Sequence, residues 1–131
     1  IGLEQMKKLE WRVQRKKEMF KLCQKLLVGA KEIEFIKTNL EDTSPWFIDI
    51  LVPAGKRNGL IEFLDGKGIG SRPFYPAIHT QKPYKWVKGK FPNAANISKR
   101  GLWLPSSSFL SNEDIKYVCS SIKEFFTKSD K

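Results

Sequence analysis

Apolar side chains recur at helical spacing along the first 28 residues of the chain. Four of them keep a seven-residue interval and two more are offset by three, and the set is Met6, Leu9, Val13, Phe20, Cys23 and Leu27. One apolar stripe, with lysine, arginine and glutamate on the other faces, is typical of an amphipathic helix. The pattern predicts a helix over residues 2–28 that Gly29 ends. Since no capping residue precedes it, we expect the helix to begin upstream of Ile1.

Three segments rich in β-branched and aromatic residues predict strands. The strongest is residues 46–52, which prolines bound on both sides. Residues 69–72 and 101–105 are shorter candidates. Between these two, residues 73–92 contain four prolines together with several aromatic residues, a composition that favours a structured loop over a flexible linker.

Helical periodicity returns in residues 56–65, in residues 93–99 and after Ser111. Ser111 is the predicted N-cap of the last helix, and carboxylates in the first turn suit the helix dipole. The predicted buried stripe of that helix is Ile115, Val118, Cys119, Ile122, Phe125 and Phe126. The order of elements predicts an α/β (α+β) sandwich, in which a small mixed or antiparallel sheet carries helices on one face.

The charge of the chain is strongly positive. There are 24 Lys+Arg against 14 Asp+Glu, a formal net charge of +10. Residues 66–112 contain no carboxylate, and their eight cations are Lys67, Arg72, Lys82, Lys85, Lys88, Lys90, Lys99 and Arg100. Such a segment favours an anionic partner, either nucleic acid, a membrane surface or a phosphorylated small molecule, while a basic surface without a partner is the alternative.

Few residues offer catalytic or metal chemistry. Cys23 and Cys119 lie in apolar helical patterns without metal-ligand spacing, so we expect two buried, reduced thiols and no metal site. His79 is the only imidazole, and it suits a hydrogen bond either to a sugar hydroxyl or to backbone. Motifs of phosphate-binding loops, nucleophile elbows and zinc proteases are absent. Without a membrane-length apolar run or a signal-peptide pattern, we expect a cytoplasmic protein.

Three segments, in collinear order, resemble the DegT/DnrJ/EryC1/StrS aminotransferases. Residues 68–79, Gly-Ile-Gly-Ser-Arg-Pro-Phe-Tyr-Pro-Ala-Ile-His, are similar to a strand and loop of that family, and their Arg-Pro-Phe form is most similar to its perosamine-synthase branch. Residues 100–115 are similar to the terminal segment of the family. Residues 2–17 resemble the helix that leads into its small domain.

The resemblance implies the C-terminal small domain of a fold-type-I aminotransferase at residues 29–131. It implies that residues 1–28 are a helix linking this domain to a large domain outside the chain. That large domain would bind pyridoxal phosphate and supply the Schiff-base lysine, so we expect no catalytic residue here and no activity of the chain alone. The implied substrate-binding residues are Ser71, Arg72, Phe74, Tyr75 and His79.

The reaction implied by the resemblance is amino transfer, from glutamate, to a 4-keto-6-deoxy sugar attached to a nucleoside diphosphate. The implied protein is a cytoplasmic homodimer without nucleic-acid or membrane partners. Two other interpretations stay open on the residues alone. A basic nucleic-acid-binding module would use the same lysines and aromatic residues, although RNP, helix-turn-helix and zinc patterns are absent. A helical interaction protein would dimerise through the N-terminal stripe, although Lys16 interrupts it.

Overall fold

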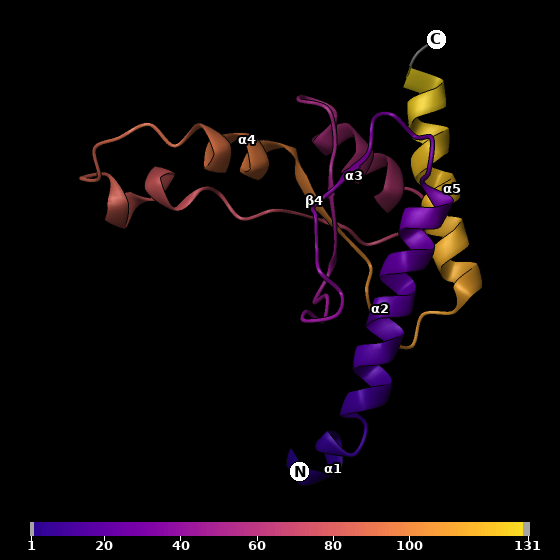
Figure 1. Cartoon of the computed structure of the whole chain (residues 1–131). Coiled ribbons are helices and arrows are strands. Elements are labelled where there is room, and N and C mark those ends of the chain that lie inside the picture. The colour runs from indigo at the N-terminus through magenta and orange to yellow at the C-terminus, as the bar shows by residue number, and fades with distance from the viewer. Residues whose placement is uncertain (1, 130–131) are drawn as a thin grey trace.

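A computed structural model describes residues 2–129 and places a four-stranded sheet at the centre of the protein (Figure 1). All pairings are antiparallel, in the order β1-β2-β4-β3. The strands are β1 (Glu34–Phe35), β2 (Ile48–Leu51), β3 (Arg72–Pro73) and β4 (Gly101–Leu104). Of the two sheet types that the sequence allowed, the antiparallel one is confirmed.

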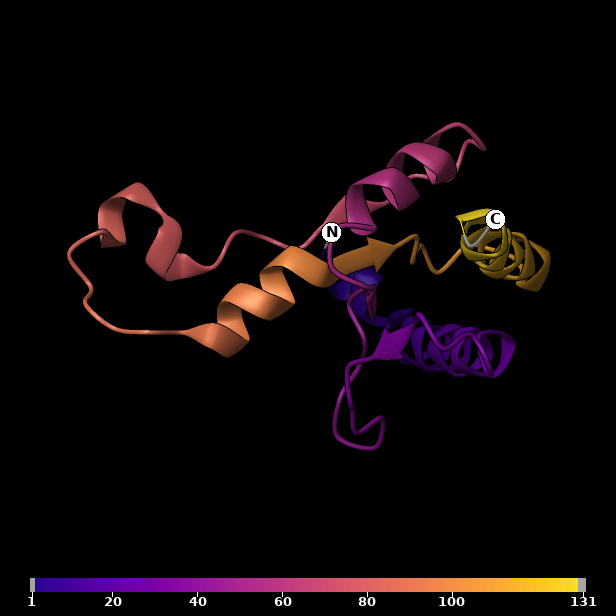
Figure 2. The ribbon, with the colours of Figure 1, turned by 90° about the horizontal axis from the view of Figure 1, so that it is seen from above.

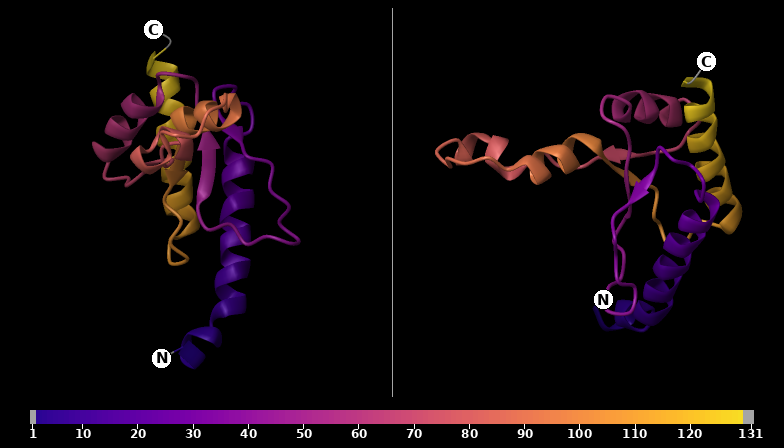
Figure 3. Two further views of the ribbon diagram at one scale, coloured as in Figure 1. Left: turned by 90° about the vertical axis from the view of Figure 1, so that its left-hand side faces the viewer. Right: turned by 45° about the horizontal axis from the view of Figure 1, so that its top comes forward.

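Three helices cover one face of the sheet: α2 (Leu9–Leu26), α3 (Arg57–Asp65) and α5 (Asn112–Ser129). Helices α2 and α5 run side by side, and α3 packs against α5 (Figures 2 and 3). The core between the layers includes Phe20, Ile48, Ile50, Leu60, Leu102, Leu104 and Ile122. Because side chains alternate along a strand, Asp49 and Trp103 point to the opposite face. The predicted α/β sandwich is therefore confirmed.

The N-terminal segment forms two helices where the stripe predicts one. Helix α1 (Gly2–Met6) is separated from α2 by a turn at residues 7–8. Helix α1 buries no residue, and the side chains of Leu3 and Met6 are 84% and 61% exposed. Short helices are marginal without tertiary packing, so α1 does not continue in line with α2, although the Arg12 side chain of α2 donates to the Gln5 side chain of α1 at 2.9 Å.

The predicted apolar stripe is buried only in the second half of α2. Phe20, Cys23 and Leu27 join the core, whereas Leu9 is 45% exposed. Met19, outside the predicted stripe, is fully buried. The helix is therefore anchored at its C-terminal end, and its N-terminal half extends beyond the sheet (Figure 1).

The strand predicted over residues 69–72 is wrong in position. The backbone N–H of Ile69 donates to the Leu64 carbonyl at 2.9 Å, which keeps this residue in the turn that closes α3. Strand β3 begins only at Arg72, and its second residue, Pro73, is tolerated because β3 lies at the edge of the sheet. The other edge strand, β1, is two residues long and was not predicted.

A long arm, defined as residues 74–100, connects β3 to β4. It contains two 3-10 turns, η1 (Ile78–Thr80) and η2 (Lys82–Tyr84), followed by helix α4 (Pro92–Arg100). The arm projects from the sheet on the side away from α2 and α5 (Figures 1 and 2). None of these three elements buries a residue. The structured loop and the short helix predicted here are confirmed, but they stand apart from the core.

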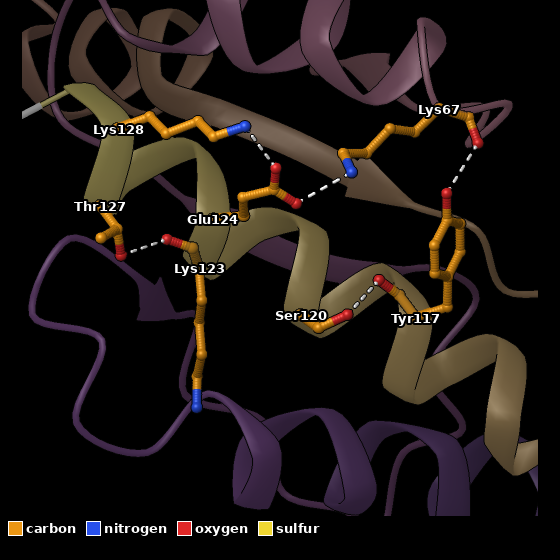
Figure 4. Close-up of polar contacts among 7 residues, drawn as sticks. All are labelled: Lys67, Tyr117, Ser120, Lys123, Glu124, Thr127 and Lys128. Atoms are coloured by element: carbon orange, nitrogen blue, oxygen red, sulfur yellow. Dashed lines mark hydrogen bonds and ion pairs between the residues drawn. The ribbon is translucent and has the colours of Figure 1, made fainter.

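Helix α5 begins at the predicted cap. The N–H of Asp114 donates to the Ser111 hydroxyl at 3.0 Å, and the N–H of Ser111 donates to the Asp114 carboxylate at 2.8 Å, a reciprocal capping box. Further along α5, the Glu124 carboxylate accepts from the Lys67 amine at 2.9 Å and from the Lys128 amine at 2.6 Å (Figure 4). The first of these ion pairs joins α5 to the end of α3.

Both cysteines are free and buried, as predicted. Their thiols hydrogen-bond across the contact between α2 and α5, and this bond, together with burial, raises the pKa of Cys23. Within residues 2–129, no cluster of three or more His, Cys, Asp or Glu side chains suits a metal ion. None of the helices in that range combines the length and apolar character needed to span a bilayer.

Candidate functional site

The sheet face away from α2 and α5 carries a row of three chemically different side chains. Trp103 on β4 lies opposite Asp49 on β2 and opposite Arg72 on β3. Residues directly opposite in antiparallel strands point to the same face, with Cβ atoms about 5 Å apart. The register therefore places a carboxylate, an indole and a guanidinium side by side across three strands.

Aromatic rings surround Trp103 on this face. The Phe47 ring stacks on the indole, with centroids 5.0 Å apart and planes at 23°. Phe74 lies 5.1 Å from it, and Tyr75 contacts it edge-on at 4.9 Å. These distances match favourable aromatic pairs. Two of the predicted substrate-binding residues thus belong to a cluster centred on Trp103.

A hollow of about 230 Å³ opens beside this cluster. Its lining includes Phe47, Ser71, Arg72, Trp103 and residues 104–106. The Ser71 hydroxyl oxygen is buried and has no hydrogen-bond partner among residues 2–129. The Arg72 side chain is exposed and forms no ion pair in the same range. An unsatisfied hydroxyl and a free guanidinium at one hollow suit a ligand with anionic or hydroxyl oxygens.

Phe74 reaches the indole because the sheet leaves space for it. Its backbone N–H donates to the Gly101 carbonyl at 3.0 Å, which extends the pairing of β3 and β4 by one bond. A Cβ atom on Gly101 would lie 2.2 Å from two atoms of the Phe74 ring. Only glycine permits an approach this close, so glycine at position 101 allows the Phe74 ring to contact Trp103.

His79 lies apart from the other four predicted residues and in a different hollow from Ser71 and Arg72. It is in η1 on the arm, and its ring is 4.9 Å from that of Phe91. It borders an apolar hollow of about 250 Å³, whose other lining residues are Ile78, Tyr84, Val87, Phe91 and Ala94. The structure therefore brings Ser71, Arg72, Phe74 and Tyr75 together at the sheet and places His79 on the arm.

One wall of the Ser71–Arg72 hollow is tied to α2 by Lys16. The Lys16 amine donates to the Trp46 carbonyl at 2.8 Å, to the Ser106 hydroxyl at 2.9 Å and to the Ser106 carbonyl. Ser106 lines the hollow and is itself buried. Burial lowers the pKa of Lys16, and all three donors of its ammonium group are in use.

Asp49 is the carboxylate at the other end of the row. It is half-buried, and burial raises its pKa, while a hydrogen bond from the Trp103 indole acts in the opposite direction. Within residues 2–129, none of the ion pairs includes Asp49. The strand register places it opposite Trp103 of the candidate site.

Sequence reasoning did not find Trp103, Asp49 or Lys16 as parts of this site. Trp103 and Asp49 lie in predicted strands. Aspartate is uncommon in strands, so an aspartate inside an otherwise apolar strand indicates a specific function at that position. Lys16 was noted only as an interruption of the apolar stripe. A charged residue on the buried side of a helix is a signal for a specific polar partner.

The fold is an α/β domain built on an antiparallel sheet, and comparison with known proteins gives its family. The chain belongs to the DegT/DnrJ/EryC1/StrS aminotransferase family, whose model matches residues 1–123. It is 33% identical over 128 residues to GDP-perosamine synthase of Escherichia coli O157:H7, covering 97% of this chain and 35% of that protein. The chain thus spans about a third of the length of the curated relatives it matches.

Solved structures share the fold. The aminotransferase TlmJ from Streptoalloteichus hindustanus superimposes with a TM-score of 0.90 at 20% identity, covering 99% of this chain and 36% of that one. Spr1654 from Streptococcus pneumoniae, in its PLP form, superimposes with a TM-score of 0.86 at 24% identity, covering 97% of this chain and 34% of the other. The coverage includes the arm, so the projecting arm is part of the shared fold.

Proposed function

We propose that this chain is the C-terminal small domain of a pyridoxal-phosphate-dependent nucleotide-sugar aminotransferase, and that it contributes substrate contacts to an active site completed by a large domain. The parent reaction is transfer of an amino group, from glutamate, to a 4-keto-6-deoxy sugar carried by a nucleoside diphosphate. The observation that carries the proposal is the hollow at the sheet edge, where Ser71 and Arg72 both lack protein partners within residues 2–129.

The chemistry of these two residues suits the proposed substrate. A guanidinium forms paired hydrogen bonds with phosphate or carboxylate oxygens, and a buried hydroxyl without a partner gains one when a ligand oxygen arrives. The aromatic wall of Phe47 and Trp103 offers an apolar surface to a ring. Arg72 would hold the anionic end of the substrate, and Ser71 would hold a neighbouring oxygen.

The described residues do not fit pyridoxal phosphate itself. The cofactor supplies the electron sink for amino transfer, and it needs a neutral lysine amine beside its aldehyde. Lys16 is half-buried, but its three donors are taken by Trp46 and Ser106. No lysine borders the hollow of Ser71 and Arg72. We therefore propose that another part of the enzyme binds the cofactor, and that this chain alone is inactive.

A trapping experiment tests the cofactor proposal. The chain is incubated with pyridoxal phosphate, reduced with borohydride, digested and analysed by mass spectrometry. We expect only scattered, substoichiometric labelling of exposed lysines. One lysine labelled stoichiometrically would contradict the proposal, because it would locate a complete cofactor site within this chain.

A binding experiment tests whether the hollow of Ser71 and Arg72 binds a nucleoside diphosphate. Equilibrium dialysis of the chain against GDP, the nucleotide in the name of the Escherichia coli relative, measures affinity for a nucleoside diphosphate. We expect Arg72→Ala to weaken binding at least tenfold, because the paired contacts to the diphosphate are lost. Arg12→Ala removes the same charge from α2, outside this hollow, and serves as the matched control. Equal affinity of Arg72→Ala and the unchanged chain would exclude the diphosphate from this hollow.

The parent enzyme is proposed to be a cytoplasmic homodimer. Its partners would be the nucleotide-sugar and the amino-acid donor, with no role for nucleic acid or membrane. The positive arm, with lysines at residues 82, 85, 88 and 90 and no carboxylate, is consistent with a diphosphate substrate.

A further inference from the structure

We propose that Lys16 is a positioning residue of the candidate site, which holds Ser106 in the wall of the hollow and so sets the hydrogen-bonding groups that a ligand of Arg72 meets there. This inference rests on the proposed function of that hollow. Lys16 is not among the residues that line the hollow, whereas Ser106 is. We therefore expect any effect of Lys16 on a bound ligand to pass through Ser106.

The first step is the set of contacts that the Lys16 amine makes. It donates to the Ser106 hydroxyl at 2.9 Å, to the Ser106 carbonyl, and to the Trp46 carbonyl at 2.8 Å. The Ser106 hydroxyl donates in turn to the Trp46 carbonyl at 2.9 Å. Trp46 precedes β2 and Ser106 follows β4, and these two strands are paired. One amine on α2 thus holds together the chain segments at the end of the hollow.

The second step concerns the two hydroxyl groups that line the hollow, those of Ser71 and Ser106. A serine hydroxyl has one hydrogen to donate. The hydrogen of Ser106 is used by the Trp46 carbonyl, and its oxygen accepts from Lys16. The Ser71 oxygen is buried and has no partner within residues 2–129. Ser71 therefore keeps a free hydrogen beside the Arg72 guanidinium, and two such donors favour a ligand with acceptor oxygens, such as a phosphate.

The third step is the choice of a lysine at position 16. It interrupts the apolar stripe of α2 between Val13 and Phe20, and a half-buried ammonium group is costly unless it has polar partners. Among residues 2–129, none of the ion pairs includes Lys16. The oxygens of Ser106 and Trp46 are the partners that account for a lysine where the periodicity favours an apolar residue.

The experiment measures GDP binding by equilibrium dialysis on the full chain, at a temperature where circular dichroism shows every variant to be folded. Lys16→Met keeps the aliphatic chain and removes the three donors. We expect it to weaken GDP binding by about fivefold or more, because Ser106 is released from its position in the wall. Equal affinity of Lys16→Met and the unchanged chain would overturn the proposal.

Two controls separate this effect from overall charge and from stability. Lys21→Met removes the same charge from an exposed position on α2. Ile122→Val loosens the core on α5, away from the residues that line the hollow. Neither variant should weaken GDP binding. If either weakened it as much as Lys16→Met does, charge or stability would explain the loss and the proposal would be wrong.

A double-mutant cycle tests whether the effect passes through Ser106. Ser106→Ala removes the hydroxyl that binds both Lys16 and Trp46, and the Lys16 bond to the carbonyl of residue 106 remains. In the Ser106→Ala background, Lys16→Met should cost less affinity than in the unchanged chain, because part of its contact is already lost. Additive losses would overturn the proposal. If Arg72→Ala weakens binding and Lys16→Met does not, the positioning role fails alone, and if neither variant weakens it, the proposed function fails as well.

Discussion

The amine of Lys16 lies 2.9 Å from the hydroxyl oxygen of Ser106, 90 residues further along the chain. This contact joins α2 to the segment that follows β4, and Ser106 in that segment lines the candidate site. The same amine also donates to the Trp46 carbonyl before β2. One side chain therefore links the N-terminal helix to both central strands.

Replacing Lys16 should destabilise the fold. In Lys16→Met the aliphatic chain is preserved, but the Ser106 carbonyl loses its side-chain donor, and the Trp46 carbonyl keeps only the bond from the Ser106 hydroxyl. Leaving partly buried acceptors unsatisfied costs about 1–3 kcal/mol. Urea denaturation followed by circular dichroism should show a midpoint lowered accordingly. Lys21→Met changes an exposed lysine on the same helix and should leave the midpoint in place. Equal midpoints for the two variants would mean that the Lys16 contacts contribute nothing to stability.

A side chain at position 101 should disrupt the aromatic cluster. In Gly101→Ala the added Cβ would overlap the Phe74 ring, which must move away from Trp103. Overpacking of this kind costs roughly 1–3 kcal/mol, and the tryptophan fluorescence should shift because the surroundings of the indole change. Gly70→Ala is the control, since a Cβ there meets no atom within 4 Å. An unchanged spectrum and stability in Gly101→Ala would contradict the close approach of Phe74 and Gly101.

The main helices and strands could be predicted because their patterns are local. The stripe of α5, the cap at Ser111 and the apolar segment around β2 are each encoded within a few neighbouring residues. The break between α1 and α2 was not predictable in the same way. It depends on whether the first residues find a packing partner, and periodicity carries no information on that point.

The candidate site was only partly predictable for a related reason. Ser71 and Arg72 could be singled out because they are consecutive in a recognisable segment. The partnership of Asp49, Trp103 and Arg72 arises from strand register between segments far apart in the chain, which spacing along one segment cannot give. The family resemblance of residues 68–79 implies that His79 binds substrate together with Arg72. Strand β3 ends at Pro73, and the arm carries the histidine away.

The two cysteines should resist alkylation while the protein is folded. Cys23 and Cys119 are each 1% exposed, so iodoacetamide cannot reach either thiol while the contact between α2 and α5 is closed. Iodoacetamide at neutral pH, followed by intact mass measurement, should leave both thiols unmodified until urea is added. Ser120→Cys places a thiol on the exposed side of α5 and should add one rapid alkylation. Rapid labelling of the unchanged chain would show that the contact between α2 and α5 opens readily.

Acid should weaken the connection between α3 and α5 at Glu124. Hydrogen bonds from the Lys128 and Lys67 amines lower the pKa of this carboxyl from 4.5 to about 2, and the bond with Glu124 raises the pKa of Lys67 (Figure 4). Because the folded-state pKa lies below the ordinary value, the stabilisation is fully present above pH 4.5 and is lost as the pH falls from there toward 2.

The urea midpoint, measured at intervals from pH 7 to pH 2, should therefore fall less steeply below pH 4.5 in Glu124→Gln than in the unchanged chain. Some acid dependence should remain in the variant, since hydrogen bonds from Ser111 also lower the pKa of Asp114. Glu62→Gln removes an exposed carboxylate from α3, and its urea midpoint should fall with pH as steeply as that of the unchanged chain. Because the Glu124 group is near the surface, 1 M salt should reduce the difference between the variants. If the urea midpoint fell equally below pH 4.5 in Glu124→Gln and in the unchanged chain, these two lysines would not stabilise the folded carboxylate.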